Sequence, residues 1–96
     1  MNVNFNKALY QLDKGKYEEA EKSICKAIDE CDNKYELLQI KCCYAELLYE
    51  LGRYDEAMQC ITYIIDNTDE YDDGSERETA LELKSWIEED IECMED

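Results

Sequence analysis

The chain has 96 residues, of which 26 are acidic and 10 are basic, so its formal net charge at pH 7 is −16. Apolar residues make up 45% of it, which is enough for a packed core and too much for a disordered chain. The strong negative charge argues against binding to nucleic acid or to an anionic membrane. It would attract a basic protein partner, but it is also typical of an acidic surface that keeps a small protein soluble, and the second interpretation is the one we favour.

Proline is absent and glycine occurs three times, so the sequence favours helices that are joined by short turns. Apolar residues at three- and four-residue steps predict an all-α fold of about five helices. Their expected ranges, in chain order, are 2–13, 17–31, 34–51, 54–67 and 75–94. Asn33 to Glu36 and Ser75 to Glu78 have the pattern of capping boxes, which begin the third and the last of these helices.

A Gly-x-Tyr-x-x-Ala motif occurs twice, and each position of the second copy lies 37 residues after its counterpart, as Tyr54 does after Tyr17. The glycine permits a turn that reverses the chain, and the small alanine lets two helices approach closely. The motif residues are Gly15, Tyr17 and Ala20 in the first copy and Gly52, Tyr54 and Ala57 in the second. The sequence therefore predicts two similar pairs of helices.

Each unit resembles a tetratricopeptide repeat, in which a small residue precedes the motif and a large apolar residue and a second small residue follow it. Those further positions are Ala8, Ile24 and Ala27 in the first copy and Ala45, Ile61 and Ile64 in the second, where isoleucine replaces the second small residue. Two family features are missing, the large residue early in the first helix (here Asn4 and Lys41) and the closing proline (here Asp32 and Asp69). The resemblance covers residues 1–67.

The resemblance implies a right-handed superhelical array of antiparallel helix pairs that forms one domain over residues 1–96. Its expected parts are a first repeat over 1–33, a second over 34–68, an acidic loop over 69–74 and a capping helix over 75–94. Members of this family bind peptides or protein partners on a concave face, to which the first helix of each pair contributes, and they are not usually enzymes.

Carried onto this chain, the resemblance predicts partner contacts at Phe5, Asn6, Leu9, Leu12, Gln39, Cys42, Glu46, Tyr49, Glu50 and Leu83. Other positions expected on the same face are Asn2, Asp13, Cys43, Glu76, Thr79 and Ala80. The lysines and asparagines with which some members clamp a terminal carboxylate are replaced by Phe5, Cys42, Leu9 and Glu46. Such an acidic, aromatic-lined face favours a basic or amphipathic segment.

Catalytic and metal-binding residues are poorly represented. The chain has no histidine, no glycine-rich phosphate loop and no nucleophile with an identifiable base, so we expect no enzyme and no cofactor. The segment from Asp69 to Gly74 is similar to a calcium loop, but Tyr71 and Ala80 stand where two ligands belong, which favours a solvated acidic turn. No cysteine pair has the spacing of a zinc site, so we expect no metal.

The six cysteines fall mostly at apolar helical positions, which predicts small buried thiols in a reducing compartment. The N-terminal segment lacks the features of a signal peptide and no apolar run could span a bilayer, so we expect a cytoplasmic protein. We expect Tyr17 and Tyr54 to fill the seam between paired helices and Trp86 to seal the end of the core. Tyr10 and Tyr49 are better candidates for partner contacts.

Three functional hypotheses remain open. The first is a non-catalytic module that binds a protein segment on its concave face. The second is an acidic inhibitor or immunity-type protein that blocks a basic enzyme such as a nuclease, because residues 66–96 hold 14 acids and only 2 bases. The third is weak self-association, for example as a homodimer, because so short an array leaves its end faces under-covered.

Overall fold

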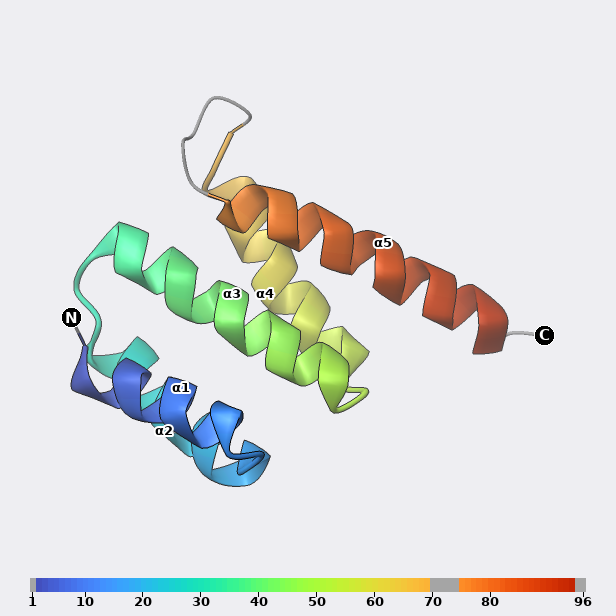
Figure 1. Ribbon diagram of the computed structural model, residues 1–96. Coiled ribbons are helices and arrows are strands. Elements are labelled where there is room, and N and C mark those ends of the chain that lie inside the picture. The colour runs from blue at the N-terminus through green and yellow to red at the C-terminus, as the bar shows by residue number, and fades with distance from the viewer. Residues whose placement is uncertain (1, 70–74, 95–96) are drawn as a thin grey trace.

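The computed structural model describes residues 2–69 and 75–94, and it contains five helices (Figure 1). They are α1 (Val3–Asp13), α2 (Tyr17–Glu30), α3 (Lys34–Glu50), α4 (Tyr54–Asp66) and α5 (Glu76–Met94). The all-α prediction is confirmed, and each observed helix end lies within one residue of its predicted position. The predicted acidic loop lies outside the described residues except for Asp69.

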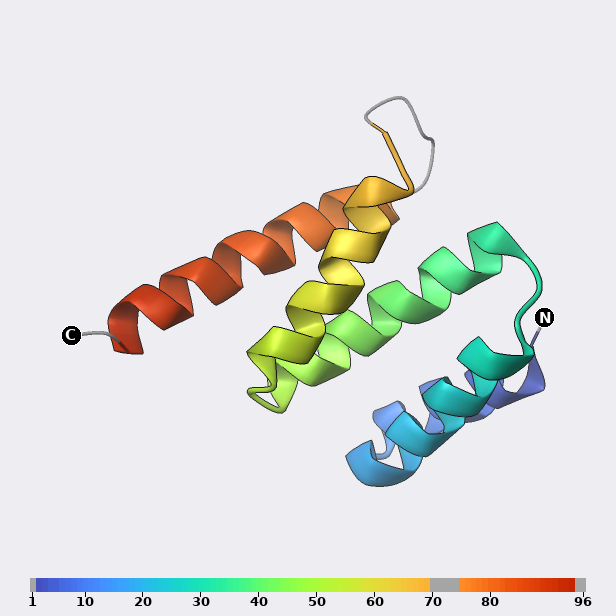
Figure 2. The ribbon, with the colours of Figure 1, turned by 180° about the vertical axis from the view of Figure 1, so that it is seen from behind.

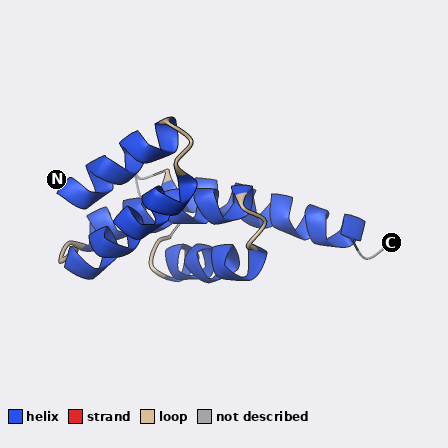
Figure 3. Ribbon diagram, turned by 90° about the horizontal axis from the view of Figure 1, so that it is seen from below, coloured by secondary structure: helices blue, strands red, loops and turns tan. Residues whose placement is uncertain are grey.

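The helices form two antiparallel pairs, α1 with α2 and α3 with α4, and α5 packs against both members of the second pair. Two opposite views show α3 in the middle, with α1 and α2 on one side and α5 on the other (Figures 1 and 2). The extents of the molecule along its principal axes are 43 × 34 × 19 Å. The smallest is close to the thickness of two stacked α-helices, each about 10 Å in diameter. The predicted array of helix pairs is confirmed, and the C-terminal half of α5 extends beyond the other helices (Figure 3).

The two short turns between paired helices have the same geometry. Gly15 and Gly52 both have a φ of 75°, in the left-handed region that glycine adopts without strain. In the first turn the amide of Gly15 donates to the carbonyl of Leu12, and in the second the amide of Gly52 donates to the carbonyl of Tyr49, each at 3.0 Å. The repeated motif therefore produces the same chain reversal twice.

Asparagine side chains begin the first helix of each pair. The side chain of Asn33 accepts hydrogen bonds from the amides of Tyr35 (2.9 Å) and Glu36 (3.2 Å), which confirms the predicted start of α3. Asn2 caps α1 in the same way, and its amide nitrogen also donates to the carbonyl of Ala27 at 3.0 Å. That second bond ties the start of α1 to the last turns of α2.

The apolar core has two clusters, and α3 contributes to both. The cluster on the α1 and α2 side contains Phe5, Ala8, Ile24, Ala27, Ile40 and Leu47. The cluster on the α4 and α5 side contains Leu38, Cys42, Ala45, Leu48, Ala57, Cys60, Ile61, Ile64, Ala80, Leu83 and Ile87. Tyr44 of α3 packs against both clusters, so α3 connects the two parts of the core.

The cysteine prediction is only partly correct. Cys42 and Cys60 are buried, but Cys25 and Cys93 are exposed, and all six thiols are free. Cys25 follows the buried Ile24 on α2, and one residue along a helix turns the side chain by about 100° from the core to the surface. Cys93 lies near the end of α5, in the part that extends beyond the other helices.

The expectation that Tyr17 fills a seam is wrong, because its side chain is 44% exposed. The equivalent Tyr54 is partly buried and packs against the second core cluster. The hydroxyl of Tyr54 also donates to Asp90 of α5, which extends past the start of α4.

Candidate functional site

Two adjoining hollows run between α3 and α5. The first has a volume of about 280 Å³ and is lined by Leu9, Gln39, Cys42, Cys43, Glu46, Ser75, Glu76 and Thr79. The second has a volume of about 250 Å³ and is lined by Glu46, Tyr49, Glu50, Thr79, Glu82, Leu83 and Trp86. Because Glu46 and Thr79 line both, the hollows adjoin each other, and we name the two together the α3–α5 groove.

Seven of the ten residues predicted to contact a partner line the α3–α5 groove. They are Leu9, Gln39, Cys42, Glu46, Tyr49, Glu50 and Leu83. Phe5 is not among the lining residues and is only 6% exposed; of the residues that do line the groove, Cys42 and Leu83 are also core residues, 9% and 2% exposed. Phe5, Ala8 and Leu12 form the stripe of α1 that packs toward α2 and α3, so a partner cannot reach Phe5. Leu12 and the exposed Asn6 do not line the groove either.

Sequence reasoning missed the contribution of Glu82, Ser75 and Trp86. The expectation that Trp86 seals the core is wrong, since its side chain is 46% exposed and forms part of the groove wall. A signal was present in the spacing, because Thr79, Glu82, Leu83 and Trp86 recur at three- and four-residue steps and therefore share one face of α5. The resemblance places only Thr79 and Leu83 of these four residues on the concave face, and Glu82 and Trp86 are not included.

A hydrogen-bonded aromatic cluster forms the wall at one end of the groove. The ring of Tyr49 stacks on that of Tyr54, with centroids 5.8 Å apart, and lies 5.9 Å from Trp86. Both tyrosine hydroxyls donate to Oδ2 of Asp90, at 3.2 Å from Tyr49 and 2.9 Å from Tyr54. Burial and the neighbouring Asp90 raise the pKa of Tyr49. The hydrogen bond to Asp90 and burial raise the pKa of Tyr54. Both hydroxyls therefore remain protonated donors at neutral pH.

The groove is negatively charged and contains weakly reactive thiols. Burial raises the pKa of Glu46, although contact with the Cys42 thiol acts in the opposite direction. Burial, with the charge of Glu46, also raises the pKa of Cys42 to about 12 and that of Cys43 to about 11. Both thiols therefore stay protonated at neutral pH and are poor nucleophiles. No lysine or arginine is among the residues that line the two hollows.

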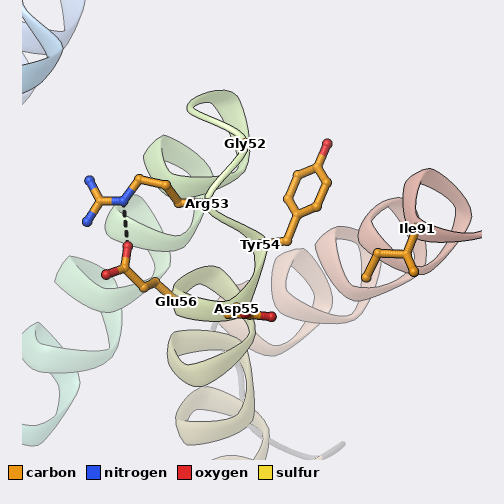
Figure 4. A pocket seen from close by; sticks show the side chains of 6 residues that line it. All are labelled: Gly52, Arg53, Tyr54, Asp55, Glu56 and Ile91. Carbon is orange, nitrogen blue, oxygen red and sulfur yellow. Dashed lines mark hydrogen bonds and ion pairs between the residues drawn. The ribbon is translucent and has the colours of Figure 1, made fainter. Parts of the chain in front are cut away.

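A further hollow of about 530 Å³ lies at the start of α4 and includes Ile91 of α5 (Figure 4). Figure 4 shows Tyr54 on the side of Ile91, whereas Arg53 turns the other way toward Glu56. Arg53 also pairs with Glu21 of α2 at 2.7 Å. Because two carboxylates already hold its guanidinium, this arginine links the helix pairs and is not free for an anionic ligand.

Within the part of the chain that the structure describes, no group of three or more cysteine, aspartate or glutamate side chains is arranged to hold a metal ion. None of the helices formed by those same residues combines the length and the apolar character needed to cross a membrane.

Comparison with known proteins identifies a family. Residues 2–33, which contain all of α1 and α2, match the family profile described as "Tetratricopeptide repeat". No curated protein and no solved structure matches the chain. Repeats of this kind generally mediate protein–protein interaction and are generally not enzymes. The matched first pair, the second pair with the same motif and turn, and the five-helix array together support a repeat protein of the tetratricopeptide repeat family.

Proposed function

We propose that this protein is a non-catalytic interaction module that binds a basic or amphipathic protein segment in the α3–α5 groove. The observation that carries the proposal is the lining of the groove. It combines the carboxylates of Glu46, Glu50 and Glu82 with the aromatic side chains of Tyr49 and Trp86, and it contains no cation. A segment that presents both positive and apolar side chains complements such a surface.

The length of the groove suits a short segment. On α3 the groove runs from Gln39 to Glu50, which lies eleven residues farther along the helix. At a rise of 1.5 Å per residue, this part of the groove is roughly 16 Å long. That distance corresponds to about five residues of an extended peptide or about three turns of a helix. A bound segment could therefore contact α1 at Leu9 and reach Trp86 on α5 at the other end.

The uneven distribution of charge over the surface supports the α3–α5 groove as the binding site of a basic segment. Lys7, Lys22 and Lys26, together with one acidic residue, Glu19, line a separate hollow between α1 and α2, with a volume of about 420 Å³. The carboxylates of Glu46 and Glu82 lie instead in the α3–α5 groove. A basic segment would therefore be attracted to the groove and repelled from the lysine-lined hollow. A cytoplasmic location remains our expectation from the sequence.

A binding assay with defined peptides tests the proposal. The probe is a fluorescein-labelled twelve-residue peptide of leucine and lysine in amphipathic order, and the comparison peptide has glutamate in place of lysine. We expect saturable binding of the lysine peptide alone, measured by fluorescence anisotropy. The triple variant Glu46→Gln, Glu50→Gln, Glu82→Gln should weaken binding by about tenfold or more, which corresponds to about 1.4 kcal/mol.

The matched control makes the same change of charge away from the groove, at the exposed Glu18, Asp29 and Asp66. The variant Glu18→Gln, Asp29→Asn, Asp66→Asn should change the affinity by about twofold or less, because distant exposed charges are screened. Equal losses in the groove variant and the control would show that only total charge matters, and the groove proposal would then be wrong.

The acidic-inhibitor hypothesis stays a separate prediction, and the same assay distinguishes it. Glu88, Glu89 and Glu92 are exposed on the part of α5 that follows the groove residues. If the triple variant Glu88→Gln, Glu89→Gln, Glu92→Gln loses binding while the groove variant keeps it, the charge of α5 is the binding surface. In that case binding should also fall steeply with salt concentration.

A further inference from the structure

The end of the α3–α5 groove beside Trp86 has the composition of a site for one cationic side chain. We propose that it receives an arginine of the bound segment, with the guanidinium between the indole of Trp86 and the carboxylates of Glu46, Glu50 and Glu82. We name this end of the groove the arginine pocket. The inference rests on the proposed function and adds the identity of the residue that the groove selects.

The aromatic wall of the arginine pocket is held in place before any partner arrives. Tyr49 is fixed by stacking on Tyr54 and by its hydrogen bond to Asp90, and Trp86 lies 5.9 Å from it at an interplanar angle of 42°. The indole of Trp86 is nevertheless 46% exposed. Tryptophan is the strongest of the aromatic side chains in attracting a cation to its face, and an exposed, supported indole can do so at little cost in conformational entropy.

Carboxylates from two helices surround this wall. Glu46 and Glu50 belong to α3, and Glu82 belongs to α5, so negative charge lines both sides of the hollow. None of the three has an ion-pair partner within residues 2–69 and 75–94. Glu46 is exposed overall, but partial burial of its carboxyl raises the pKa of that group, and a bound cation would favour its charged form again.

The cations of the chain itself do not fill the pocket. Lys41, on the same helix as Glu46, has its ammonium 4.0 Å from the centroid of the Tyr63 ring. Arg53, close to the end of α3, is held by Glu21 and Glu56. Neither side chain is among the residues that line the hollow. The charge of the pocket is therefore left for a cation from another molecule.

Two features favour arginine over lysine and over a larger ligand. A guanidinium is planar, so it can stack on Trp86 while its five N–H groups reach carboxylates on both helices, whereas an ammonium is a compact and strongly hydrated charge. The volume of about 250 Å³ is also below the range of roughly 300–1,000 Å³ that is usual for small-molecule sites. One long side chain fits this space better than a complete small molecule.

The test uses Trp86 as its own reporter, because it is the only tryptophan in the chain. Three twelve-residue amphipathic peptides are titrated against the protein, with arginine, lysine or citrulline at the polar positions. Citrulline keeps the planar shape of arginine and lacks its charge. We expect the arginine peptide to change the emission of Trp86 and to bind about tenfold more tightly than the citrulline peptide, with the lysine peptide between them.

Variants assign the preference to the pocket. With labelled peptides, Trp86→Leu and Glu82→Gln should each reduce the preference for arginine over citrulline, while Trp86→Phe, which keeps an aromatic ring, should retain most of it. Tyr35→Phe and Tyr35→Leu are the matched controls, because Tyr35 is an exposed aromatic residue of α3 outside the groove lining. Circular dichroism of each variant shows whether the helices are intact.

The outcomes separate this inference from the proposed function. If the arginine and citrulline peptides bind equally and the groove variant weakens both, the groove is a binding site and the arginine pocket is wrong. If binding prefers arginine but Trp86→Leu and Glu82→Gln leave the preference unchanged, the pocket is likewise wrong. If no peptide binds to the folded protein, both the proposed function and the pocket are overturned.

Discussion

The hydroxyl of Tyr44 on α3 donates a hydrogen bond of 2.7 Å to the carboxylate of Glu21 on α2, although 23 residues separate them in the chain. Arg53 reaches the same carboxylate at 2.7 Å. These three side chains join the first helix pair to the second, beside the position where Tyr44 contacts both clusters of the core. They connect the repeats at a place away from the α3–α5 groove, so they can be altered without changing the groove lining.

The Glu21 cluster should make stability depend on pH. The hydrogen bond from Arg53, and then that from Tyr44, lower the pKa of Glu21 below its ordinary value of 4.5, although burial acts against them. A carboxyl whose pKa is lowered on folding stabilises the protein above its unfolded pKa, and that stability is lost as pH falls through the folded pKa. Because Arg53 is more than a third exposed, we expect only about 0.5–1 kcal/mol at pH 7.

The measurement is the melting temperature of the wild type and of Glu21→Gln between pH 7 and pH 3. The wild type should melt a few degrees higher at pH 7, and the difference should shrink as the solution becomes acidic. Glu18→Gln, at an exposed position on the same helix, is the control. A difference between wild type and Glu21→Gln that stays constant down to pH 3 would contradict the prediction.

The turn glycines should resist substitution because of their backbone conformation alone. A Cβ at Gly15 or Gly52 would meet no atom within 4 Å, but both residues have a φ of 75°. Gly15→Ala and Gly52→Ala should therefore each lower the free energy of unfolding by about 1–2 kcal/mol. Urea denaturation measures this loss. Asparagine tolerates the left-handed region better, so Gly15→Asn and Gly52→Asn should lose less, and equal losses for both substitutions would argue against backbone strain.

The two tyrosines that share Asp90 should show coupled effects. Tyr49→Phe and Tyr54→Phe each remove one hydrogen bond to the same carboxylate oxygen and keep the stacked ring. We expect each single variant to lower the melting temperature slightly and the double variant to lower it by an amount that differs from the sum. A strictly additive double-mutant cycle would show that the two hydroxyls do not act through Asp90 together.

Thiol reactivity should follow exposure and pKa. At pH 8 the exposed Cys25 and Cys93 should react quickly with iodoacetamide, whereas Cys42 and Cys43, with pKa values raised to about 12 and 11, should react slowly. Pulse labelling followed by mass spectrometry of the peptides identifies the modified residues. In denaturant all six should react at similar rates. Rapid labelling of Cys42 in the folded protein would contradict the structure of the groove.

The helices and turns could be predicted from the sequence because their signals are local. The apolar spacing along each helix, the left-handed glycines 15 and 52 and the capping Asn33 all act within a few residues of their position in the chain. The repeated motif added the pairing of the helices. Most of the residues on the α3 side of the groove were also expected, because the resemblance to tetratricopeptide repeats places Gln39, Cys42, Glu46, Tyr49 and Glu50 on the concave face.

The remaining part of the site depends on contacts between distant residues. Trp86 and Tyr17 are both aromatic residues on amphipathic helices, yet neither is buried as expected. Their exposure depends on which helix lies beside them and on how far that helix extends. Apolar periodicity identifies the buried stripe of a helix, but it does not show which partner covers each part of that stripe.

The sequence by itself determined that this protein is all-helical, that its helices are paired and that it resembles tetratricopeptide repeats, because periodicity, turn glycines and caps are properties of neighbouring residues. Only the tertiary structure decided that Glu82 and Trp86 face Glu46 and Tyr49 across a groove. The physical reason is that the rotation of α5 about its axis, and its position against α3, result from the packing of side chains more than thirty residues apart, which no local pattern specifies.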